Sequence, residues 1–211
     1  MLTHHIYPLT LSIMLLTATT AFAGDSPADI KQRSGTGDPI AGKEKSAMCQ
    51  GCHGEDGNSA TADFPKLAGQ YADYIQKQIH DFKAGSRKDP VMTDMAATIT
   101  EKQDLLDIAA YFASQKQMKG ASSIVNKAGQ ARFMEEGNGC VGCHGINGKG
   151  MAPNDSSAPV IGGQHKEYLV KQLKDFKSRA RTNESSGMMA FVAGSMSDAE
   201  MEEVASYVSG L

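Results

Sequence analysis

The feature that most constrains this chain is a five-residue motif that occurs twice. It reads Cys49-Gln50-Gly51-Cys52-His53 in the first half and Cys140-Val141-Gly142-Cys143-His144 in the second, and together the copies use all four cysteines. Cys-x-x-Cys-His is the attachment sequence for c-type haem. Thiols three positions apart lie about one helical turn apart on one face, so both can bond the vinyl groups of one porphyrin. The next histidine then lies against the iron as its proximal ligand.

The repeated motif therefore predicts two covalent haem c groups. The predicted thioether and proximal-ligand residues are Cys49, Cys52 and His53 for the first haem, and Cys140, Cys143 and His144 for the second.

Two other uses of paired cysteines fit the sequence less well. A structural disulfide or a thioredoxin-like redox pair has no use for a histidine at the next position in both copies. A zinc site could recruit both pairs, but such pairs lie closer together than the 87 residues that separate Cys52 from Cys140. Haem attachment is the interpretation that uses every residue of the motif.

Residues 1–23 have the pattern of a secretory signal peptide. Leu9 to Thr20 is an apolar run too short to span a bilayer, and Ala21-Phe22-Ala23 is a small-residue cleavage site. The segment before the run carries no Lys or Arg, which is weak for a signal, so an uncleaved anchor is the alternative. Cleavage after Ala23 predicts a periplasmic protein, in agreement with haem attachment outside the bacterial cytoplasm.

Composition limits how the remaining chain can fold. Cleavage leaves 188 of the 211 residues, enough for one medium domain or two small ones. Aromatic residues are 6% of the chain and tryptophan is absent, which is little for two hydrophobic cores. A domain of about 90 residues is marginal on its own burial, so each haem is expected to form much of its core. The net charge of −3 is scattered, and no basic block suggests nucleic acid as a partner.

Apolar spacing predicts an all-α fold. Residues 70–84 and 101–114 each carry an apolar stripe at helical spacing, and Asp38 with Pro39 is typical of a helix start. Residues 24–38 are polar and predict a flexible leader. Residues 115–126 are also polar and predict a linker.

The second half repeats the plan of the first. Tyr74, Gln78, Asp81, Phe82 and Lys83 fall without a gap on Tyr168, Gln172, Asp175, Phe176 and Lys177. The last helix of the chain, residues 198–209, matches residues 101–112 in the same way. The chain is therefore predicted to contain two helical domains, at 39–114 and 127–211, each wrapped around one haem.

Methionine recurs where a second iron ligand is needed. Met92 and Met189 occupy matching positions upstream of the last helix of their halves. A thioether on a loop across from the proximal histidine is a suitable sixth ligand, and His/Met ligation raises the reduction potential. Met95 and Met188 stay open as alternatives, because methionines also fill gaps in protein cores and this chain has twelve.

Two further histidines, His80 and His165, align with Lys174 and Tyr71 and so lie outside the repeated pattern. A bis-histidine iron in both halves is therefore excluded for this chain alone. Both residues are expected at the surface.

With these residues identified, the chain resembles the cytochrome c4 family of exported, di-haem class I cytochromes c. The resemblance covers about residues 39–211 and includes both haem motifs, the segment 64–70, the Lys-Gln pairs at 77–78 and 171–172, the segment 109–116, and Arg181-Thr182-Asn183. It implies two tandem class I cytochrome c domains related by a pseudo-twofold axis, with the propionate edges of the haems facing each other.

The resemblance also implies roles for individual residues. The axial methionines of the family fall on Met92 and Met189, and the prolines that orient its proximal histidines fall on Pro65 and Pro159. The second half departs from the first, because its interval from Cys143 to Gln164 is three residues longer than the corresponding one. We therefore expect the two haem pockets to differ in potential.

The predicted function is a periplasmic electron carrier rather than an enzyme, because no acid–base pair or nucleophile needs explaining. Electrons would pass from a quinol-oxidising complex or dehydrogenase to a terminal oxidase or reductase, and peripheral membrane association stays open. One alternative is a di-haem subunit of a larger oxidoreductase, such as flavocytochrome c sulfide dehydrogenase. Another is a di-haem peroxidase, which needs one open iron.

Overall fold

The computed structural model describes residues 26–120, 125–137, 139–150 and 158–211. Within these ranges the chain forms eleven α-helices and no β-strand, which confirms the predicted all-α fold. Across the same residues, no helix combines the length and apolar character needed to cross a membrane. The predicted signal peptide and its cleavage site lie outside the described residues.

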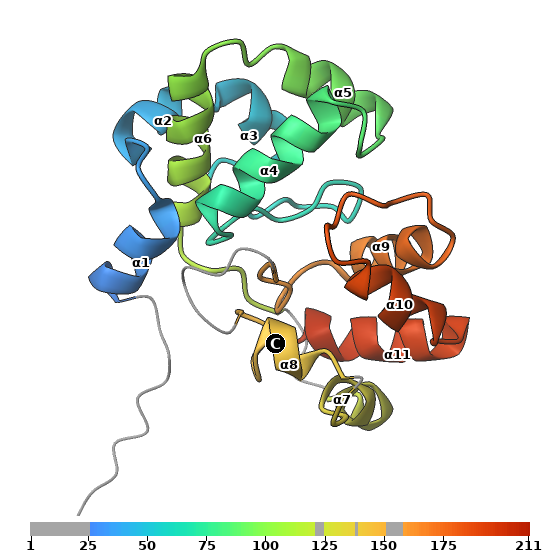
Figure 1. Cartoon of the computed structure of the whole chain (residues 1–211). Helices are drawn as coiled ribbons and strands as arrows, with labels where there is room; N and C mark the ends of the chain where they lie inside the picture. Colours follow the sequence, from blue (N-terminus) through green and yellow to red (C-terminus); the bar gives the residue numbers. More distant parts are fainter. Residues whose placement is uncertain (1–25, 121–124, 138, 151–157) are drawn as a thin grey trace, which may run out of the picture.

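Six helices form the first half, drawn from blue to green in Figure 1. They are α1 (Pro27–Ser34), α2 (Pro39–Lys45), α3 (Ala47–His53), α4 (Ala72–Lys83), α5 (Pro90–Ala97) and α6 (Lys102–Ser114). Helix α6 is central, because α1, α2 and α4 all pack against it, and α5 packs on α4. Its buried face, which includes Ile108 and Phe112, meets Ile75 of α4 in the core of this half.

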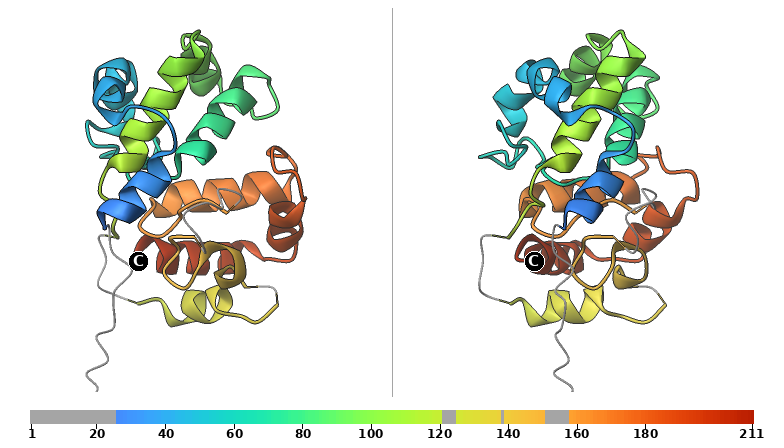
Figure 2. Two further views of the ribbon diagram at one scale, coloured as in Figure 1. Left: turned by 60° about the vertical axis from the view of Figure 1, so that its left-hand side comes forward. Right: turned by 90° about the vertical axis from the view of Figure 1, so that its left-hand side faces the viewer.

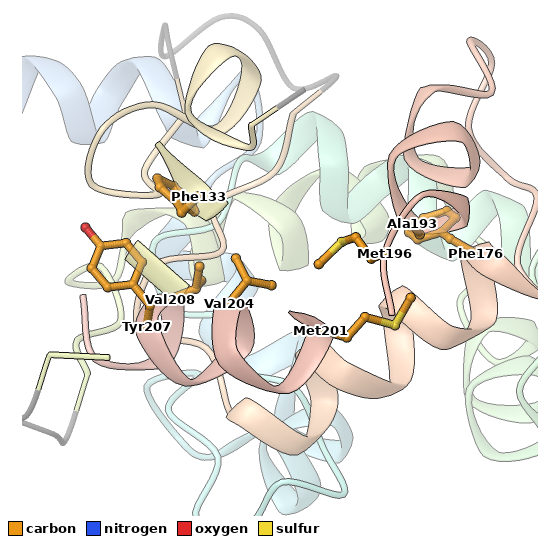
Figure 3. Close-up of a cluster of buried hydrophobic side chains, with 8 residues drawn as sticks. All are labelled: Phe133, Phe176, Ala193, Met196, Met201, Val204, Tyr207 and Val208. Atoms are coloured by element: carbon orange, nitrogen blue, oxygen red, sulfur yellow. The ribbon is translucent and has the colours of Figure 1, made fainter. Parts of the chain in front are cut away.

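Five helices form the second half, drawn from yellow to red. They are α7 (Lys127–Phe133), α8 (Val141–His144), α9 (Lys166–Lys177), α10 (Met188–Gly194) and α11 (Asp198–Ser209). Helices α7 and α9 pack against α11, and α10 packs on α9. Figure 3 shows the core that results, in which Phe133 of α7 and Phe176 of α9 belong to one cluster with Met201 and Val204 of α11.

One close helix crossing occurs in both halves and requires glycine. A Cβ atom on Gly42 of α2 would lie 2.0 Å from the carbonyl oxygen of Asp107 in α6, and one on Gly129 of α7 would lie 1.9 Å from that of Glu203 in α11. Real carbon and oxygen atoms cannot approach so closely, so a larger residue would push the helices apart. The first helix of each predicted domain is thereby held directly against the last.

The predicted flexible leader contains an ordered helix, so that prediction is wrong for residues 26–34. Ser26 caps α1, and Asp29 completes a capping box with it. Arg33 is 5% exposed, and its Nε–H donates to the carbonyl oxygen of Ala113 on α6. The polar composition concealed a short helix whose cap and docking contact are themselves polar.

The predicted linker is also more ordered than its composition suggests. Met118 is fully buried, and its N–H donates to the carbonyl oxygen of Ala68. The N–H of Gly120 donates to the carbonyl oxygen of Leu211, the last residue of the chain. The prediction of an uncommitted linker is wrong for residues 115–120, because one apolar side chain and these main-chain bonds fix the segment. Residues 121–124 lie outside the described residues.

The two halves lie against each other in all three views (Figures 1 and 2) and join through reciprocal hydrogen bonds. The Gln70 side chain donates to the carbonyl oxygen of Val160 at 2.9 Å and accepts the Val160 N–H at 3.0 Å. Gln164 makes the same two bonds with the backbone of Lys66, both at 2.9 Å. Because these residues match in the repeat, the junction has the expected pseudo-twofold arrangement.

A second reciprocal contact involves Arg87 and Arg181, which also match in the repeat. Each guanidinium donates to the glutamine of its own half and to the tyrosine and glutamine of the other. For Arg87 the acceptors are Gln78 (2.6 Å), Tyr168 (3.0 Å) and Gln172 (3.0 Å), and for Arg181 they are Gln172 (2.7 Å), Tyr74 (3.0 Å) and Gln78 (3.2 Å). Two cations thus share the same two glutamine oxygens in the junction.

Candidate haem sites

A histidine at the end of a short helix is fixed in the same way in each half. His53 ends α3 and His144 ends α8, and both are buried, with 5% and 6% of their surface exposed. The Nδ1 atom of His53 lies 2.8 Å from the carbonyl oxygen of Pro65, and that of His144 lies 2.8 Å from the carbonyl oxygen of Pro159. The sequence resemblance expects Pro65 and Pro159 to orient these histidines, and the structure places both carbonyls in position to do so.

These bonds determine which imidazole nitrogen can bind a metal. A carbonyl oxygen can only accept, so Nδ1–H is the donor and Nε2 keeps its lone pair. Burial lowers the pKa of both His53 and His144, and outweighs the opposing effect of the proline carbonyls. Each half therefore presents a neutral imidazole, held in one tautomer, with Nε2 free for iron.

The four cysteines lie beside these histidines, on α3 and at the start of α8. Cys52 and Cys143 are exposed, whereas Cys49 and Cys140 are half-buried against the hydrophobic cores. Burial raises the pKa of the Cys49 thiol and raises that of Cys140 to about 11. A thioredoxin-like redox pair depends on a lowered thiol pKa, so these environments do not favour that alternative.

The methionines predicted as sixth ligands lie in the first turn of two short helices rather than in loops. Met92 is the third residue of α5 and Met189 is the second residue of α10, and both are half-buried. Helix α10 directs Met189 towards the core of the second half, while its neighbour Met188 is 50% exposed. Burial thus favours Met189 over Met188. It does not separate Met92 from Met95, which are both half-buried.

The two remaining histidines have different surroundings. His80 on α4 is exposed, as expected. His165 is not a surface residue, because it lies half-buried at the junction with its Nε2 2.9 Å from the hydroxyl oxygen of Ser59 in the other half. Its partner in the repeat, Tyr71, also reaches across, and its hydroxyl donates to the carbonyl oxygen of Lys149 at 2.8 Å. The matching tyrosine was the available signal that position 165 belongs to the junction.

Sequence reasoning missed other residues around the sites. It recorded Arg181 only as part of a resemblance and did not single out Arg87, although their equal distance from the repeated Tyr-x-x-x-Gln pattern was visible. It also missed Asp89 and Glu184, whose carboxylates bond the backbone at Met92 and Met189. Glu184 has no counterpart in the repeat, so no sequence signal identified it.

Comparisons with known proteins agree with this geometry. The family model for cytochrome c matches the chain twice, over residues 40–116 and 127–211. Cytochrome c4 of Pseudomonas aeruginosa is 43% identical over 182 residues, which is 83% of this chain and 89% of that protein. The chain belongs to the cytochrome c4 family.

Two further proteins are similar to this chain over most of its length. The crystal structure of reduced recombinant cytochrome c4 from Pseudomonas stutzeri matches with a TM-score of 0.75 at 43% identity, over 83% of this chain and 99% of that one. A protein named thiosulfate dehydrogenase electron acceptor, from Stutzerimonas stutzeri, is 32% identical over 97% of this chain and 94% of its own length. As a member of the cytochrome c4 family, the chain is a di-haem electron-transfer cytochrome with two tandem cytochrome c domains and two covalent haem c groups.

Proposed function

We propose that this chain is a periplasmic electron carrier whose two irons are each closed by histidine and methionine. His53 and Met92 would bind the first iron, and His144 and Met189 the second. The covalent bonds to the haems would come from Cys49, Cys52, Cys140 and Cys143. Bound haem supplies a one-electron couple between ferric and ferrous iron.

The observation that carries this proposal is that the same histidine environment is built twice. In each half a buried, neutral imidazole is fixed at 2.8 Å by a proline carbonyl, and a half-buried methionine stands on a separate helix. If the histidine and the methionine of each half both bound the iron, no coordination position would be left for a substrate. The protein would then transfer electrons without catalysing a reaction.

Export and partners belong to the same proposal. The pattern of residues 1–23 supports secretion with cleavage after Ala23. Soluble carriers of this kind pass electrons between larger complexes, so a quinol-oxidising complex or dehydrogenase is the proposed donor and a terminal oxidase or reductase the proposed acceptor.

Spectroelectrochemical titration of the secreted protein tests the proposal. We expect two high-potential waves from six-coordinate haems. Mass spectrometry of the same protein should show the added mass of two haems. Met92→Ala and Met189→Ala should each abolish the far-red methionine–iron band of one haem. An unchanged band in both single variants would overturn the ligand assignment, and rapid cyanide binding by the ferric protein would favour a peroxidase.

A second candidate is a cytochrome subunit of a larger oxidoreductase, such as a flavin-dependent sulfide dehydrogenase. It is supported by the relative whose name makes it the electron acceptor of a thiosulfate dehydrogenase. A dehydrogenase that co-purifies in fixed ratio with this chain would favour the subunit, whereas an isolated monomer that soluble partners reduce and oxidise would favour the carrier.

A further inference from the structure

One contact recurs at both candidate methionine ligands. In the first half, Asp89 is the N-cap of α5, and its Oδ1 accepts the N–H of Met92 at 3.0 Å. In the second half, Glu184 accepts the N–H of Met189 at 2.9 Å and, through its other carboxylate oxygen, that of Ala190 at 2.9 Å. A carboxylate therefore holds the backbone amide of the candidate methionine in each half.

The two contacts are not copies of one another. Met92 follows Arg87 by five residues, whereas Met189 follows the matching Arg181 by eight. Gly187, the N-cap of α10, has a φ of 69° and no side chain to cap the helix. Glu184 reaches over from the longer loop and bonds the amides that a cap residue would otherwise serve. Two different local structures thus place a carboxylate at the backbone N–H of the candidate methionine in each half.

The amide matters because it sets where the sulfur can lie. A methionine side chain has three rotatable bonds and adapts to irregular surroundings, so its Sδ keeps one position only if its backbone is fixed. Hydrogen bonds from N–H groups to ionised carboxylates are stronger than those between neutral groups. They fix the first turns of α5 and α10 where the candidate ligands are attached.

We infer, on the basis of the proposed function, that Asp89 and Glu184 are positioning residues for the sixth ligands of the two irons. Each carboxylate holds the backbone of its methionine so that the thioether stays on the iron and small molecules stay off it. The bond from Glu184 also distinguishes Met189 from Met188, whose N–H bonds the hydroxyl of Ser186 instead.

Competition by imidazole for the ferric irons tests this role in the purified di-haem protein. Asp89→Ala should weaken the far-red methionine–iron band of the first haem, and Glu184→Ala that of the second. Loss of a cap should raise the apparent imidazole affinity of that haem about five- to thirtyfold, because the closed state loses the bonds that favour it. Asp89→Asn keeps a side-chain oxygen but loses the charge, so its affinity should lie between those of the wild type and Asp89→Ala.

Ser197→Ala is the matched control. Ser197 caps α11 in the second half through a capping box with Glu200, and neither residue bonds a candidate ligand. This variant should lower the melting temperature and leave imidazole affinity within about twofold of the wild type. If Glu184→Ala fails to mature, Glu184→Gln tests the same contact and should give an intermediate affinity.

The possible outcomes separate the inference from the proposed function. Unchanged imidazole affinity in Asp89→Ala and Glu184→Ala would overturn the positioning role, and so would an equal rise in Ser197→Ala. A wild-type protein without a methionine–iron band would instead refute the proposed ligands themselves.

Discussion

The two halves hold their histidines identically but hold the surrounding elements differently. His53 and His144 share the same burial and the same 2.8 Å contact with a proline carbonyl. At the junction, by contrast, Tyr71 in one half is matched by His165 in the other. The contrast teaches that the environment of the buried histidine is the more tightly specified part of the repeat. The contacts around it need only supply a hydrogen bond to the other half, to Lys149 from Tyr71 and to Ser59 from His165.

The largest effect should come from removing one haem at a time. One double variant replaces Cys49 and Cys52 with serine, and the other replaces Cys140 and Cys143 with serine. The mass of each variant should be lower than that of the wild type by one haem. Each double substitution should also remove about half of the helical circular dichroism, since a domain of about 90 residues is marginal without its cofactor. Mass spectrometry and circular dichroism check both expectations. Full helicity in either variant would show that the haem is not needed for that core.

The shared arginines offer a smaller, unequal effect. Arg181 is 8% exposed and its Nε–H also donates to the Asn183 side chain, whereas Arg87 is half-buried. Arg181→Ala should lower the free energy of unfolding by about 2–4 kcal/mol, and Arg87→Ala by about 1–3 kcal/mol, because buried acceptors lose their donors. Guanidinium chloride unfolding measures both.

Lys171→Ala is a control for these arginine variants, since it removes only an exposed ion pair with Asp175. Its effect should stay within about 0.5 kcal/mol. Equal losses for Arg87→Ala and Arg181→Ala would show that the two sides of the junction contribute alike.

Removing one hydroxyl at the junction should have a more modest effect. Tyr71→Phe deletes the bond to the carbonyl of Lys149 and should cost about 1 kcal/mol. Tyr111→Phe is the matched control, because its hydroxyl bonds the carbonyl of Glu55 within the first half. Both variants should reduce the free energy of unfolding. Only Tyr71→Phe should make the two halves unfold in two separate transitions, which haem absorption and circular dichroism can follow. Separation in the control alone would contradict the assigned junction.

The smallest effect should be a pH dependence of stability. It arises at the junction from His165 in the second half, because the matching residue in the first half is Tyr71. Burial, and then the charge of Lys66, lowers the pKa of His165. Below the ordinary histidine pKa of about 6.5 the unfolded chain takes up a proton that the folded chain resists, so stability should fall as pH decreases towards 5.

Comparison with His165→Tyr isolates this contribution, because the variant carries the residue found at the matching position. Thermal unfolding at pH 7 and pH 5 should show a smaller loss of stability in the variant than in the wild type. The other histidines are common to both proteins, so their titration cancels. Identical losses would show that His165 does not titrate across this range.

Much of the fold could be predicted because it depends on local pattern. The apolar stripe at residues 70–84 became α4, and the one at 101–114 became α6. The final helix was placed at 198–209, where α11 lies. These segments carry their own periodicity, so their type and approximate bounds can be predicted without knowledge of distant contacts.

The unpredicted parts depend on contacts made far along the chain. Arg33 and Met118 look like ordinary residues of polar segments, and only their docking onto α6 and Ala68 reveals their role. Met92 is expected on a loop from the sequence, whereas Asp89 caps and Pro90 begins the short helix α5 that carries it. The proline carbonyls came from family resemblance, since no spacing rule would have paired residue 53 with residue 65.

The reciprocal hydrogen bonds of Gln70 and Gln164 have a consequence for engineering. Both side chains grip peptide groups, at Lys66 and Val160, and every amino acid except proline offers the same pair of atoms. Because these contacts are made to backbone atoms, they do not depend on which side chains the opposing loop carries. Either domain could therefore be exchanged for a divergent homologue and still dock, provided that the glutamine, the path of the opposing loop and the arginine, tyrosine and glutamine of the second contact were kept.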